Sequence, residues 1–175
     1  MDHMIFVDVT RCLSCRTCEI ECAVAHSKSK DLLGSIDEVP HPQPRVSLDG
    51  MESLAVPIQC RHCEAAPCAV ICPTGAISKR GFDGPVVINE KLCIGCRSCI
   101  LVCPYGVPQS RGDGRVITKC DLCFERLERG EEPACVSGCP TGALKYRRGS
   151  QISREIEKKT TDRFAFRPSQ EPVNS

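Results

Sequence analysis

Short apolar runs, separated by turn-forming residues, dominate the hydrophobic pattern of this chain. None approaches the roughly 20 apolar residues of a membrane span, so no direct membrane span is expected. The pattern predicts short β-strands at residues 5–9, 76–79, 86–89 and 143–147. A turn-rich stretch joins the second strand to the third and predicts a hairpin. The first and last strands have no partner nearby in the sequence, so we expect them to pair with each other.

Two stretches fall outside this pattern. Residues 23–59 contain four prolines and read as an irregular insertion, with a hairpin through 46–48 and 54–56, that is either a surface loop or a docking surface. Residues 149–175 are polar, with a short helix predicted from about 151 to 159 and disorder beyond it. We expect this C-terminal tail to dock on a partner subunit.

Composition changes the picture, because the apolar runs are too poor in large side chains to stabilise a fold alone. Among 175 residues there are no Trp, two Tyr and five Phe, but 16 Cys. Either disulfides or metal groups could compensate. The first ten residues have no basic segment or long apolar run of a signal peptide, which predicts a cytoplasmic protein, where disulfides rarely persist. Export alongside a signal-bearing partner is the alternative. Metal binding is therefore the favoured interpretation.

The cysteines fall into four groups of four with none left over: Cys12, Cys15, Cys18, Cys22; Cys60, Cys63, Cys68, Cys72; Cys93, Cys96, Cys99, Cys103; and Cys120, Cys123, Cys135, Cys139. The first group maps onto the third at an offset of 81, and the second maps onto the fourth at 60 and then 67. Three thiolates two residues apart can wrap one [4Fe–4S] cluster, while the fourth, expected to begin a helix, ligates another. Structural zinc, which prefers two C-x2-C pairs, and a disulfide framework fit this spacing poorly.

The predicted strand pairs decide which groups share clusters. The hairpin joins the second group to the third, and the terminal strands join the first to the fourth. Sequential pairing of first with second and third with fourth remains the alternative, but it would leave both terminal strands unpaired. Exchanging the fourth cysteine within each pair predicts four sets of ligands: set A is Cys12, Cys15, Cys18, Cys139; set B is Cys22, Cys120, Cys123, Cys135; set C is Cys60, Cys63, Cys68, Cys103; and set D is Cys72, Cys93, Cys96, Cys99.

Four such clusters would change the formal net charge of +1 to about −7, so nucleic-acid binding is not expected. Basic residues beside the cysteines instead offset the cluster charge: Arg16, Arg61, Arg97 and Lys119. Among the histidines, His62 is the one most expected to hydrogen-bond near a cluster. No catalytic triad, carboxylate pair or glycine-rich phosphate loop is evident, which predicts a non-catalytic chain.

The four-group order, with wider middle gaps in the second and fourth groups, resembles the electron-transfer subunits of the dimethyl-sulfoxide-reductase and formate-dehydrogenase type. The segments 62–68 and 119–123 carry the resemblance beside the cysteines. It implies an α+β fold of two intertwined ferredoxin-like modules with short hairpins, short helices and long loops. Expected boundaries are an outer module (1–22 plus 105–148), an insertion (23–59), an inner module (60–104) and a docking tail (149–175).

Within that family, residues 22–30 look like the iron–sulfur subunits of carbon monoxide dehydrogenase and of cytoplasmic tungsten aldehyde oxidoreductases. The resemblance implies a subunit that relays electrons between a tungsten, molybdenum or nickel enzyme and a flavin-containing NAD(P)H-linked subunit or ferredoxin. Formate dehydrogenase and hydrogenase are less favoured partners. Because clusters in single file have two ends, the chain could also associate end to end with copies of itself. The alternative is a free, diffusible polyferredoxin.

Overall fold

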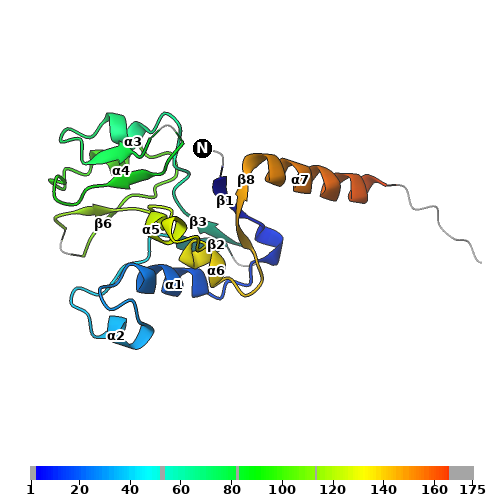
Figure 1. Cartoon of the computed structure of the whole chain (residues 1–175), viewed down its shortest axis with the longest axis horizontal. Coiled ribbons are helices and arrows are strands. Elements are labelled where there is room, and N and C mark those ends of the chain that lie inside the picture. Colours follow the sequence, from blue (N-terminus) through cyan, green and yellow to red (C-terminus); the bar gives the residue numbers. More distant parts are fainter. Residues whose placement is uncertain (1–2, 52–53, 82, 113, 166–175) are drawn as a thin grey trace, which may run out of the picture.

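The computed structural model describes residues 3–51, 54–81, 83–112 and 114–165. Within these ranges, short helices surround four separate two-stranded antiparallel sheets (Figure 1). The predicted α+β class is confirmed. Each sheet in the described ranges has only two strands, and a two-stranded sheet is marginally stable by itself. The side chains that surround the cysteines must therefore supply most of the packing.

The two ends of the folded body meet in one sheet. Strand β1 (His3–Val7) pairs with β8 (Leu144–Arg148), and Ile5 lies opposite Tyr146. The ladder continues past the strands, since the amide of Asp8 donates to the carbonyl oxygen of Ala143 at 2.8 Å. The predicted pairing of the terminal strands is confirmed, and it brings the first cysteine group beside the fourth.

The other sheets are hairpins. The two that were predicted are confirmed: β4 (Ile77–Lys79) with β5 (Val86–Ile88), and β2 (Ser47–Met51) with β3 (Leu54–Ile58). Residue 82, in the turn of the first hairpin, lies outside the described residues. Two elements were not predicted: the hairpin of β6 (Gln109–Ser110) and β7 (Ile117–Thr118), and helix α2 (Leu32–Ile36). Both are short, and neither has a clear apolar period.

Four short helices carry cysteines: α1 (Thr17–Ala25), α3 (Pro67–Val70), α4 (Ser98–Val102) and α6 (Ala134–Ser137). The prediction that the fourth cysteine begins a helix is wrong, because each helix instead starts just before the third cysteine. Arg16 and Arg97 adopt left-handed backbone conformations and cap α1 and α4, while Pro67 and Pro133 begin or cap the other two. The remaining short helices are η1 (Val9–Arg11) and α5 (Phe124–Glu128).

The buried side chains form two cores, and cysteines contribute to both. The first core combines residues from the two ends of the sequence with Val46 from the insertion: Ile5, Cys18, Cys22, Val46, Leu122, Cys135, Val136 and Leu144. The second lies around the β4–β5 hairpin: Ala66, Cys68, Ile77, Val86, Cys99 and Ile117. The predicted module boundaries stay a prediction, and Ile117, from the segment assigned to the outer module, packs in the second core.

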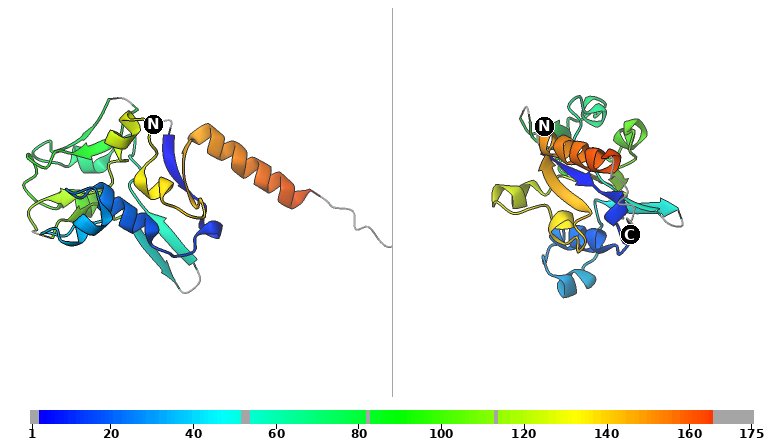
Figure 2. Two further views of the ribbon diagram at one scale, coloured as in Figure 1. Left: turned by 60° about the horizontal axis from the view of Figure 1, so that its bottom comes forward. Right: turned by 90° about the vertical axis from the view of Figure 1, so that its right-hand side faces the viewer.

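Helix α7 (Gly149–Phe164) extends away from the body, as the left-hand view shows (Figure 2). It is anchored as far as Lys159: Ile152 is buried, Glu155 pairs with Lys145 at 2.7 Å, and Lys159 pairs with Asp8 at 2.6 Å. The helix is longer than the predicted 151–159, and residues 166–175 of the predicted tail lie outside the described residues. Across the described ranges, no helix combines the length and apolar character needed to span a membrane.

Strand β1 offers a matched pair of variants. Ile5→Ala removes a side chain that is 4% exposed in the first core, whereas Met4→Ala alters a neighbour that is 40% exposed. We expect Ile5→Ala to destabilise the protein by about 2–5 kcal/mol, since it leaves a cavity, and to lower Tm clearly. Met4→Ala should change Tm little. Equal Tm values for the two variants in anaerobic thermal unfolding would contradict this role for the β1–β8 sheet.

Candidate metal centres

Three cavities are each lined by four cysteines, and the three quartets are those of sets A, C and D. The cavity of set A also touches Leu48 and Pro57 of the insertion. The empty space at each, with the adjoining open solvent included, is about 310 Å³ for set A, 370 Å³ for set C and 320 Å³ for set D. Such similar sizes suit three copies of one occupant.

The cysteines of set B are all buried. Burial raises the pKa of the Cys135 thiol well above its ordinary value, and the neighbouring thiols of Cys120, Cys22 and Cys123 raise it further. These are the other three members of the set. The cavities thus bring twelve of the sixteen predicted residues together in fours, and the other four, those of set B, are all buried.

The repeated spacing in the sequence reappears as repeated backbone conformation. Ser14 and Gly95, 81 residues apart, both have positive φ, and so do Arg16 and Arg97. These left-handed residues turn the loop so that successive thiols face inward. Gly95 has a second constraint, because a Cβ there would lie 2.5 Å from the carbonyl oxygen of Arg115.

The Cys-Pro-Thr-Gly turns match as well. Gly75 and Gly142 have φ values of 63° and 60°, and each donates its amide to the carbonyl of the cysteine three residues earlier. The hydroxyls of Thr74 and Thr141 lie 3.7 Å from the sulfurs of Cys72 and Cys139. Each turn therefore fixes the fourth cysteine of its group and then directs the chain into a strand.

The donor set fits iron–sulfur clusters. All sixteen cysteines are free thiols rather than disulfides, and the cavities of sets A, C and D have apolar side chains between the sulfurs. Burial raises the pKa of Cys18, Cys99 and Cys123 to about 11. These thiols are neutral without a metal, so metal binding must release their protons. Thiolate-rich, apolar sites select iron–sulfur clusters or zinc over harder cations.

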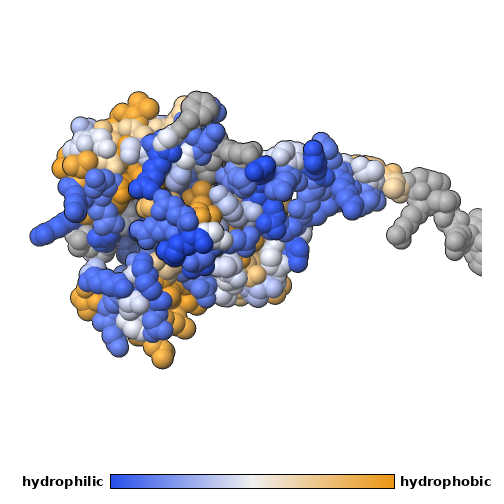
Figure 3. Space-filling model, in the orientation of Figure 1, coloured by the Kyte–Doolittle hydropathy of each residue, from blue (hydrophilic) through white to orange (hydrophobic). Residues whose placement is uncertain are grey.

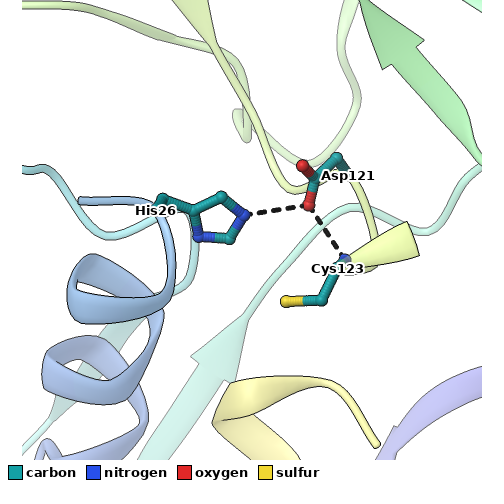
Figure 4. Close-up of side chains that lie close together, drawn as sticks. All are labelled: His26, Asp121 and Cys123. Carbon is teal, nitrogen blue, oxygen red and sulfur yellow. Dashed lines mark hydrogen bonds and ion pairs between the residues drawn. The ribbon is translucent and has the colours of Figure 1, made fainter. Parts of the chain in front are cut away.

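A polar network braces the loop of set B (Figure 4). The carboxylate of Asp121 accepts hydrogen bonds from the His26 ring at 3.1 Å, the Arg45 guanidinium at 2.6 Å and the Cys123 amide at 2.9 Å. Burial alone would lower the pKa of His26, but hydrogen bonding to Asp121 and Cys22 raises it to about 9. Burial would raise the pKa of Asp121, but these partners hold it well below its usual range. Since the guanidinium already neutralises the carboxylate, the trio in Figure 4 supports the loop and is not a separate metal site.

The insertion contributes directly to set B, which the sequence did not reveal. The backbone amide of Arg45 donates to the Cys22 sulfur at 3.2 Å, and the amide of Leu48 donates to the Glu19 carboxylate at 2.7 Å. Both contacts come from backbone groups, so no residue type marks them. Asp121 could have been noticed, because it stands between Cys120 and Cys123 in the motif.

The basic residues expected to offset cluster charge differ in their contacts. Lys119 donates to the Cys60 sulfur at 3.6 Å. Arg16 pairs with Glu19 on the surface, and Arg61 lies over the ring of Tyr105. Lys119 is therefore the one of these three whose side chain contacts a cysteine sulfur.

Neighbouring sets are linked in series by pairs of thiols. Burial is the main cause that raises the pKa of Cys135, and the nearby thiol of Cys18 raises it further. A thiol of set A therefore lies near a thiol of set B. The same relation holds between Cys60 and Cys120, which links set B to set C. Cys68 acts in this way on Cys99 and links set C to set D. Cysteines of sets A and B also share the first core, and cysteines of sets C and D share the second, which favours the order A, B, C, D.

Comparison with known proteins agrees with this picture. Residues 51–148 match the family model described as a 4Fe-4S dicluster domain. An iron-sulfur protein of Rhodospirillum rubrum is 42% identical over 81% of this chain and 80% of its own length. The electron transport protein HydN of Escherichia coli K12 is 36% identical, covering 94% of this chain and all of HydN.

The B subunit of anaerobic dimethyl sulfoxide reductase, also from Escherichia coli K12, is 38% identical over 93% of this chain and 80% of its own length. The family model covers more than half of the chain, and each of these relatives exceeds 30% identity over most of both sequences. The chain therefore belongs to the 4Fe-4S dicluster family, among the iron–sulfur subunits of the dimethyl-sulfoxide-reductase type.

Proposed function

We propose that this chain is a non-catalytic electron-transfer subunit that holds four [4Fe–4S] clusters, one in each of sets A to D. Clusters bound by thiolates supply one-electron transfer. The observation that carries the proposal is the grouping of twelve free cysteines into three quartets around separate cavities, beside four more cysteines that are all buried. Four cysteines for each cluster leave no iron open to a substrate, which favours a relay over an enzyme.

The two ends of the series are the places where electrons would enter and leave. Cys15 of set A and Cys96 of set D are exposed, whereas every cysteine of set B is buried. Leu13 and Ile94, at matching positions in the repeat, line the cavities of sets A and D and are 72% and 67% exposed. An exposed apolar side chain beside a terminal cavity suits contact with another redox protein.

The partner proposed for one end is a catalytic oxidoreductase subunit. The dimethyl sulfoxide reductase relative is by name part of an enzyme, and residues 22–30 resemble subunits that accompany aldehyde and carbon monoxide oxidising enzymes. A tungsten, molybdenum or nickel enzyme is therefore the proposed partner, with a flavin subunit or ferredoxin at the other end.

Helix α7 is the proposed docking arm. Beyond its anchor at Lys159 it exposes Phe164, and the view in Figure 3 shows a largely hydrophilic α7 beside a body with apolar surface around α3 and α4. A helix anchored as far as Lys159 presents its last turn, residues 160–164, to a partner. A free polyferredoxin, the alternative function, would have no use for such an arm.

Paired substitutions test the four quartets. Cys12→Ser and Cys139→Ser should each lower iron from about sixteen to about twelve atoms per chain, since each removes a ligand of one cluster. Because both belong to set A, the double variant should still hold about twelve. The matched double variant Cys135→Ser/Cys139→Ser affects two sets and should hold about eight. Sequential pairing of the groups predicts about eight for both double variants, and that outcome in anaerobic iron analysis would reject the quartets.

Truncation tests the docking arm. Deleting residues 160–175 keeps Ile152, Glu155 and Lys159, so the anchor of α7 and the iron content should be unchanged. We expect copurification with the catalytic partner to fall at least about tenfold, the equivalent of roughly 1.4 kcal/mol of binding free energy. The Phe164→Ala variant of the full-length protein separates the apolar contact from the rest of the arm. A complex that survives the truncation would contradict the proposal.

Anaerobic pull-down from native cells with metal analysis tests the partner. Tungsten or molybdenum with a large subunit would support an aldehyde or formate enzyme, and nickel would support a carbon monoxide dehydrogenase or hydrogenase. About sixteen iron atoms per chain without any partner would favour the free polyferredoxin.

A further inference from the structure

Two buried polar side chains lie where the cysteines of the two middle sets approach each other. Lys119 is 3% exposed and His62 is 1% exposed. They stand beside Cys60 of set C and Cys120 of set B, the thiols that link these two sets. The role inferred below for these two side chains rests on the proposed four-cluster function. That function does not itself require either side chain.

The ammonium of Lys119 is directed at one sulfur. Its Nζ donates to the carbonyl oxygens of Val86 and Cys120, the latter at 2.9 Å, and to the sulfur of Cys60 at 3.6 Å. Of these three partners, only the sulfur can carry a negative charge. A buried ammonium is costly unless an opposite charge lies nearby, so the position of Lys119 is stabilised when Cys60 is a thiolate ligand.

His62 is directed at the other sulfur. Its Nδ1 accepts a hydrogen bond from the amide of Val86 at 3.1 Å, so the proton of the neutral ring is on Nε2. That nitrogen lies 3.8 Å from the sulfur of Cys120 and can donate to it. Val86, 1% exposed in β5, thus orients both residues, His62 through its amide and Lys119 through its carbonyl.

The internal repeat shows that the fold does not require this pair. At the offset of 60 between the second and fourth groups, Lys119 corresponds to Gln59, and His62 corresponds to Leu122. Gln59 donates instead to the carbonyl of Ile5, and Leu122 packs in the first core. The equivalent positions therefore accept neutral residues whose side chains serve other contacts.

We propose that Lys119 and His62 are positioning residues that raise the reduction potentials of the two middle clusters. Lys119 acts on set C through Cys60, and His62 acts on set B through Cys120. A cluster becomes more negative on reduction, so a cation or an N–H donor beside its sulfur stabilises the reduced state. Lys119 raises the potential more than His62 does, because its ammonium carries a full positive charge whereas the neutral ring offers only an N–H dipole.

The test substitutes each residue by its counterpart in the repeat. Lys119→Gln should lower the midpoint potential of one reduction step by about 59 mV, which is tenfold in the equilibrium constant of a one-electron couple. His62→Leu should lower a different step by a smaller amount. Lys158→Gln, which removes an exposed lysine of α7, should leave every step unchanged. The measurement is an anaerobic redox titration of the full-length protein followed by electron paramagnetic resonance, with iron counted in each sample.

The outcomes separate a tuning role from a structural one. Lys119→Arg keeps the charge and should hold the potential near that of the unmodified protein. Full iron content with unchanged potentials in Lys119→Gln and His62→Leu would overturn the proposal, and so would loss of about four iron atoms in either variant. An unmodified protein with far fewer than about sixteen iron atoms would overturn the four-cluster function itself.

Discussion

The antiparallel pairing of β1 with β8 joins segments more than 130 residues apart, and the arrangement of the first core depends on it. The ladder sets the loop that begins at Cys12 beside the turn that contains Cys139. It also carries Ile5 and Leu144 into the core that surrounds set B. A long-range pairing of this kind has a high entropic cost of loop closure, so ten strand residues alone would hold it weakly. Cysteines on both sides, bridged by a shared metal group, would offset that cost.

The spacing of the cysteines predicted the features that repeat along the chain. Contacts between unrepeated segments became visible only in the structure. The offsets of the repeat and the turn signals were enough to predict the three quartets that line cavities, the β4–β5 hairpin and the terminal strand pair. The helices were misplaced because left-handed Arg16 and Arg97 set the starts of α1 and α4, and arginine carries no signal for that conformation. The amide of Arg45 on Cys22 was invisible because any residue except proline can supply it.

The contacts of the cysteines with the rest of the protein differ between the ends and the middle. At the ends, sulfurs lie near threonine hydroxyls and solvent, as at Cys15 and Cys139. In the middle they meet the side chains of a buried lysine and a buried histidine. Electrostatic interactions are stronger in such a setting, where each donor acts on a sulfur with little screening. The same four-cysteine motif therefore provides chemically distinct sites along one polypeptide.

The split of the first core between the two ends of the sequence also has a consequence for biosynthesis. As the polypeptide leaves the ribosome, β4, β5 and all eight cysteines of sets C and D have emerged by residue 103, so that half can close early. Strand β1 and the thiols of Cys12, Cys15 and Cys18 emerge first but must wait for β8. For most of translation these thiols have no β1–β8 sheet beside them, and a polypeptide truncated before residue 144 would never complete the cavity of set A.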